Sequence, residues 1–158
     1  MNEPKQLKFS NYINQLELKG AFTSTKYDLN FETDFQLYTY QQGGSVYAEN
    51  RAIELKSVFN IDREASTYTI KNADLNFAKL PFVINGFLKN LEDGMFIDLT
   101  IASENVSIPA IIQLLPETQK STLEKYQIDG NILFDGLIKG EISSLKSPSF
   151  QFNFQVDK

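Results

Sequence analysis

Two runs near the end of the chain decide its fold: Gly130-Asn-Ile-Leu-Phe-Asp-Gly-Leu-Ile-Lys-Gly140 and Pro148-Ser-Phe-Gln-Phe-Asn-Phe154. In both runs an apolar residue or a glycine recurs at every second position. This spacing is typical of a β-strand with one apolar face. Nothing beside the two runs could transfer a proton at neutral pH or hold a soft metal. We therefore interpret them as parts of a sheet and not as a catalytic site.

Three glycines, Gly130, Gly136 and Gly140, fall on the apolar side of the first run. Glycine weakens a strand, so glycines repeated on one face indicate a bulge, a bend or the close approach of another element. An unbroken strand from Tyr126 to Ile142 would be about 55 Å long. Since that is longer than most strands, we expect a bend or turn at Asp135-Gly136.

The same alternation runs through most of the chain upstream. It predicts strands over Leu29–Leu37, Ile53–Ile61 and Met95–Ile101, and one or two more over Leu7–Phe22, with Gly20 as a break. Turns are expected at Gln41–Ser45, Asp62–Ser66 and Leu91–Gly94, and Pro81 indicates a strand start or an edge strand.

One stretch, residues 107–125, predicts a short kinked helical segment. Ser107 or Ile108 would cap the helix, with Pro109 in its first turn. Pro116 would end or kink it, and a second short helix would follow over Glu117–Lys125. We expect this segment to lie over one end or one face of the sheet.

Composition narrows the classes of function. The 158 residues contain no Cys and no His, which removes thiol nucleophiles, catalytic triads and zinc sites of the usual kind. The net charge is −5 and the Lys and Arg residues are scattered, so nucleic-acid binding is not expected. Carboxylate pairs such as Glu32 with Asp34, or Asp129 with Asp135, fit a solvated strand face better than a glycosidase site. We expect no enzymatic activity, no cofactor and no metal.

The segment from Leu75 to Val156 resembles the C-terminal region of bacterial AsmA-like proteins, in particular the large Bacteroidetes-type versions. The resemblance depends on the order of its pieces. They are Asp74-Leu75-Asn76-Phe77, Leu99-x-Ile101-x-Ser103, Val106-x-Ile108, Leu114-Leu115-Pro116, Leu123, the glycine run from Gly130 to Gly140, and Pro148-x-Phe150-x-Phe152.

The resemblance implies a periplasmic β-groove with an apolar interior, part of a longer protein that is anchored in the inner membrane. Such proteins are tied to lipid transport, outer-membrane biogenesis and the integrity of the cell envelope. No membrane helix is visible in the chain. We therefore expect a soluble fragment, in which lipid acyl chains are the candidate ligand.

The expected fold is mostly β, or α+β by class, in a single domain over residues 1–158. It is a large twisted antiparallel sheet, curled or sandwich-like. An open edge strand would favour dimers through strand or groove contacts. The residues expected to face lipid, or to form the core, are Phe31, Phe35, Leu55, Phe59, Ile97, Leu99, Ile101, Ile132, Phe134, Ile138, Phe152 and Phe154.

The same residues would also suit the core of a closed β-sandwich that binds a protein or glycan partner or has a structural role. In that case the tyrosines would offer a stacking surface. They are Tyr12, Tyr27, Tyr38, Tyr40, Tyr47 and Tyr68.

Overall fold

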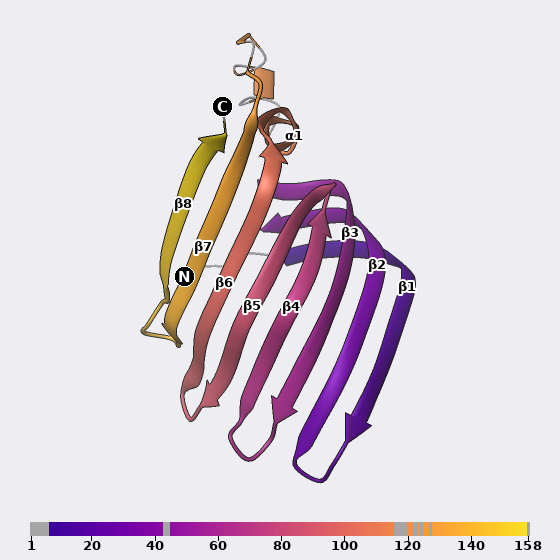
Figure 1. Ribbon diagram of the computed structural model, residues 1–158, viewed down its shortest axis with the longest axis vertical. Helices are drawn as coiled ribbons and strands as arrows, with labels where there is room; N and C mark the ends of the chain where they lie inside the picture. Colours follow the sequence, from indigo (N-terminus) through magenta and orange to yellow (C-terminus); the bar gives the residue numbers. More distant parts are fainter. Residues whose placement is uncertain are drawn as a thin grey trace.

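The computed structural model describes residues 7–42, 45–115, 120–121, 123, 125–126 and 128–157. These residues form one antiparallel sheet in which eight strands follow one another in sequence order (Figure 1). The strands are β1 (Leu7–Phe22), β2 (Lys26–Gln42), β3 (Ser45–Asp62), β4 (Thr67–Phe77), β5 (Leu80–Leu91), β6 (Gly94–Ser107), β7 (Asn131–Ile142) and β8 (Ser149–Asp157). The expected mostly β fold is confirmed, and the described residues form a curled single sheet instead of a two-sheet sandwich.

Short turns connect the strands where the sequence predicts them. Leu91 pairs with Gly94, so β5 and β6 are joined by a two-residue turn, and β4 begins directly after the predicted turn at Asp62–Ser66. Gly43 and Gly44, from the predicted turn between β2 and β3, lie outside the described residues. The turn between β4 and β5 has no glycine: Ala78 and Lys79 have φ values of 51° and 72°, as a tight hairpin turn requires.

Two predicted interruptions are wrong. Gly20 pairs with Leu29 inside an unbroken β1, and Gly136 pairs with both Ile101 and Phe152 inside an unbroken β7. The predicted bend assumed a strand from Tyr126, whereas β7 begins at Asn131 and is only 12 residues long. Gly136 instead allows a close approach, because a Cβ there would lie 2.9 Å from Cδ1 of Phe152.

The strand register gives the sheet an apolar face and a polar face. Leu55, for example, pairs with Thr33 on one side and with Leu75 on the other, and the match of apolar residues continues across the sheet. The opposite face carries ion pairs such as Lys56–Glu32 at 3.7 Å and Lys139–Asp98 at 2.6 Å. All buried non-glycine residues of the described strands lie on the apolar face: Thr33, Leu37, Ser57, Ala73, Leu80, Ser103 and Val106.

The apolar face is the inside of the curl. The ends of β1, β2 and β3 farthest from the β1–β2 turn bend over toward α1 (Ile108–Ile112) (Figure 1). Arg51 Nη2 of β3 donates a hydrogen bond to the carbonyl oxygen of Gln113, directly after α1, at 3.3 Å. Leu37 is 5% exposed at this end. We call the two sides the inner and the outer face, and the end at α1 the capped end.

The helix is shorter than the sequence predicts. Ser107 is its N-cap residue and Pro109 lies in its first turn, as expected. It ends at Ile112, and the predicted kink at Pro116 lies outside the described residues. Of the predicted second helix over Glu117–Lys125, the described residues Lys120, Ser121 and Leu123 are helical, and most of the remaining residues lie outside the described part of the chain.

The molecule exposes far more surface than a compact protein of its size. Its accessible surface is 11431 Å² for a mass of 18.0 kDa. A compact monomer of that mass would expose roughly 8,000 Å². Because no second layer covers most of the described sheet, much of its inner face remains in contact with solvent.

Candidate functional site: the inner face of the sheet

The strand register places all twelve predicted apolar residues on the inner face. Phe31 pairs with Ser57, Phe35 with Ile53 and Leu99 with Ile138, and the remaining residues fall on the same side by alternation. Gly136 and Gly140 lie there too, opposite Ile101 and Ile97. Gly130 precedes β7, and its carbonyl oxygen accepts a hydrogen bond from the Ile108 N–H at 3.0 Å.

The exposure of the inner face is greatest at its two edges. Leu16 and Leu18 of β1 are both 58% exposed, while Phe154 of β8 is 65% exposed. Apolar residues on the central strands are mostly half-buried by their neighbours in the sheet. This distribution is that of a single-layer sheet, in which an apolar side chain gains cover only from the adjacent strands.

Aromatic rings form a cluster on the inner face of β5, β7 and β8. The Phe134 ring lies edge-on to Phe82, with the ring centroids 6.2 Å apart. It is stacked on Phe152 at 5.7 Å and tilted toward Phe154 at 5.2 Å. Ring pairs at these distances stabilise a fold beyond their buried area. Phe134 is therefore the centre of the apolar surface on this side of the sheet.

Few polar groups interrupt the inner face, and most of them are satisfied within the fold. The Thr33 hydroxyl donates to the Gln15 carbonyl oxygen at 2.9 Å, and the Ser103 hydroxyl donates to the Pro81 carbonyl oxygen. By alternation the register places the charged residues Arg51 and Glu49 on this face, both toward the capped end. Such a surface can bind apolar chains but offers few hydrogen-bonding groups with which to distinguish one ligand from another.

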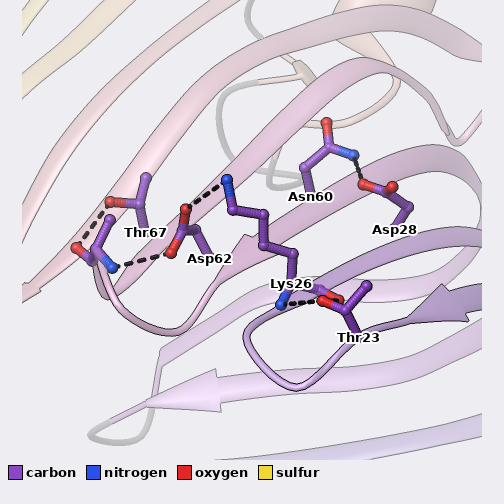
Figure 2. Close-up of polar contacts among 7 residues, drawn as sticks. Thr23, Lys26, Asp28, Asn60, Asp62 and Thr67 are labelled. Carbon is purple, nitrogen blue, oxygen red and sulfur yellow. Dashed lines mark hydrogen bonds and ion pairs between the residues drawn. The ribbon is translucent and has the colours of Figure 1, made fainter.

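Turns at the end of the sheet opposite α1 form a rim (Figure 1), and Figure 2 shows polar contacts of this rim. Asp62 Oδ1 accepts a hydrogen bond from the Ala65 N–H at 2.9 Å, and Asp62 Oδ2 lies 3.4 Å from Lys26 Nζ. These contacts, the backbone hydrogen bond above all, lower the pKa of Asp62 below its usual value. The turn at Thr23 is a further part of this rim, and the Thr23 hydroxyl donates a hydrogen bond to the Lys26 carbonyl oxygen at 3.0 Å.

Three of the four carboxylates considered as catalytic pairs make structural contacts: Glu32, Asp34 and Asp129. Glu32 pairs with Lys56, and Asp34 Oδ1 accepts a hydrogen bond from Asn14 Nδ2 at 3.1 Å, both on the outer face. Asp129 Oδ1 accepts one from the Gly130 N–H at 2.8 Å. In the described part of the chain, no three acidic side chains are grouped so as to hold a metal ion.

The described tyrosines do not gather on one surface. Register places Tyr12 on the outer face, opposite Gln36, whereas Tyr27 and Tyr68 lie on the inner face on either side of Ile61. The Tyr27 hydroxyl accepts a hydrogen bond from Arg63 Nη1 at 3.1 Å. The side chain of Tyr47 lies outside the described residues. The described tyrosines therefore do not form a common stacking platform.

The prediction of the inner face missed three groups. Leu16 and Leu18 belong to a strand whose period is shifted between Ile13 and Gln15. Phe82 lies in Phe82-Val83-Ile84, where both faces are apolar, so alternation gives no signal. Phe150 and Val156 follow the same period as Phe152 and Phe154, and that period could have identified them.

Comparison of the chain with protein-family models, with curated proteins and with solved structures found no match. None of the helical residues that the structure describes belongs to a helix with the length and apolarity needed to span a bilayer.

Proposed function

We propose that this chain is a segment of an apolar β-groove that binds the acyl chains of lipids. The observation that carries the proposal is the inner face itself. It is apolar across all eight strands, and both of its edges are open among the described residues. Large apolar surfaces that stay exposed on a protein are usually binding surfaces.

Physical chemistry favours acyl chains over other apolar ligands for this surface. A row of half-buried Phe, Leu and Ile side chains gives an extended chain contact along its whole length, and each buried CH₂ contributes roughly 0.8 kcal/mol. Since the inner face has few free polar groups, binding would depend little on the chemistry of the headgroup. We expect broad lipid selectivity and no catalysis.

The sequence resemblance to AsmA-like proteins supports the same proposal at the level of the whole protein. The order of elements expected from it, a strand, a short helix, a glycine-bearing strand and a Pro-led strand, matches β6, α1, β7 and β8. We propose that the chain belongs to a longer, inner-membrane-anchored protein of the periplasm with a role in outer-membrane lipid homeostasis.

Two substitutions in one strand test the binding surface. Phe154 and Gln155 are neighbours in β8, both exposed, and they point to the inner and the outer face. We would equilibrate each protein with phospholipid vesicles, remove the vesicles and count bound phospholipid by native mass spectrometry. Phe154→Lys should reduce bound lipid severalfold, whereas Gln155→Lys should leave it unchanged. Equal loss in both variants, or no bound lipid in the original chain, would refute the proposal.

A further inference from the structure

The edge of β8 that faces away from β7 is unusually well suited to pair with another strand. Within the described part of the chain, β8 pairs with β7 alone, so one of its backbone edges has no partner. The register between β7 and β8 has no shift from Asn131↔Asp157 to Lys139↔Ser149. Phe150–Val156 also contains no charged residue and no proline. It therefore lacks the bulges, charges and prolines with which proteins block pairing at a sheet edge.

The other edge of the described sheet, β1, has those protections. Its register with β2 shifts between Ser10 and Asn11 and again between Ile13 and Gln15. The strand also carries charged residues, including Lys8 and Lys19. Pairing of β1 with β8 of another molecule would be head-to-tail and would close only if several copies formed a ring, whereas pairing of β8 with β8 closes as a dimer.

We propose that β8 pairs antiparallel with β8 of a second copy of this chain, about a two-fold axis at Asn153. Asn153 is the middle residue of Ser149–Asp157, so this register uses the whole strand. It places Phe152 opposite Phe154 of the second copy, and Gln151 opposite Gln155 of the second copy. Each inner-face residue lies opposite an inner-face residue of the second copy, and each outer-face residue lies opposite an outer-face residue. The inner faces of the two copies therefore join, and so do their outer faces.

The inner face gains most from this pairing. Phe150, Phe152 and Phe154 are 60%, 47% and 65% exposed at the edge, and a second β8 would cover part of each ring. The ring cluster around Phe134 ends at this edge and would continue into the cluster of the second copy. The result is one sheet of two copies with a continuous apolar inner face. The proposal concerns assembly and does not depend on lipid binding.

Charges on the outer face of β8 test the register without disturbing the inner face. The double variant Gln151→Lys/Gln155→Lys sets like charges opposite each other twice across the proposed axis. Gln151→Lys/Gln155→Glu, at the same two exposed positions, sets opposite charges there. Because cross-strand charge pairs contribute a few tenths to one kcal/mol each, the two dissociation constants should differ about tenfold.

Sedimentation equilibrium over a concentration series measures these constants, with circular dichroism as the check that both variants fold. We expect a dimer for the original chain and for the Lys/Glu variant, and a weaker dimer for the Lys/Lys variant. A monomer at every concentration, or equal constants for the two variants, would overturn the proposal.

Cross-linking locates the edge independently, because the chain has no cysteine of its own. Asn153→Cys places one thiol on the proposed axis, directly opposite its copy, so mild oxidation should give a disulfide-linked dimer. Lys19→Cys on β1 is the matched control and should stay monomeric. Faster cross-linking of Lys19→Cys than of Asn153→Cys would assign the contact to the other edge and overturn the proposal.

Discussion

Replacing Phe134 with alanine removes the centre of the aromatic cluster, and its cost can be worked out from the three ring contacts. The ring meets Phe82, Phe152 and Phe154 at centroid distances of 6.2, 5.7 and 5.2 Å. Such pairs contribute about 0.5–1.5 kcal/mol each beyond area burial. Phe134 is only half-buried, so the loss should stay below the 3–5 kcal/mol of a fully buried Phe→Ala change. We expect Phe134→Ala to lower the free energy of unfolding by about 2–3 kcal/mol.

Urea unfolding followed by circular dichroism measures this loss. With a slope of about 2 kcal/mol/M, the midpoint should fall by about 1–1.5 M. Leu133→Ala is the matched control, since Leu133 is the next residue, faces outward and is 39% exposed. Its cost should stay under about 1 kcal/mol. A midpoint shift for Phe134→Ala no larger than that of Leu133→Ala would show that the cluster does not stabilise the sheet.

Three further predictions concern glycines and a turn. Gly86→Ala should be among the most damaging small changes, at about 3 kcal/mol or more, because φ is +135° and a Cβ would lie 2.0 Å from the Asp98 carbonyl oxygen; a thermal melt close to that of the original chain would contradict this. Gly136→Val should cost less, about 1–2 kcal/mol, because the obstructing group is the movable, exposed Phe152 ring; denaturant unfolding in parallel with Gly86→Ala gives the order. Asp62 should titrate below the usual aspartate pKa, so its contribution to stability is present above the unfolded pKa and is lost as pH falls through the lower folded pKa. Carboxyl NMR titration checks this, and Ala65→Pro, which removes the N–H donor, should raise the midpoint.

The sequence predicted the strands well because most of them have one face exposed to water. Alternation such as that over Leu29–Leu37 is clear only when polar residues occupy the other face, and every strand of this single-layer sheet meets solvent there. The same regularity placed all twelve predicted residues on one face. The register between strands followed from short turns such as Leu91–Gly94, which leave little freedom for slippage.

Strand length and bulges could not be predicted from alternation alone. Gly136 was predicted to mark a bend because the sequence does not reveal which residue lies beside it on the neighbouring strand. In the structure that neighbour is Phe152, whose ring occupies the space that a Cβ at Gly136 would need. Asn72 and Asn105 adopt φ values of 45° and 60° at register shifts in β4 and β6. Asparagine tolerates this conformation better than most residues, but it is also common in ordinary turns.

Photo-cross-linking with a phospholipid that carries a diazirine in its acyl chain tests the central claim most directly, because it reports which side of the sheet meets the chain. After illumination, modified residues are located by peptide mass spectrometry. We expect labels on Leu16, Leu18, Phe150, Phe152 and Phe154, all reduced by unlabelled phospholipid. Labels spread equally over outer-face residues such as Gln151 and Asn153, or labels that unlabelled lipid does not reduce, would contradict the assignment of the inner face as a lipid groove.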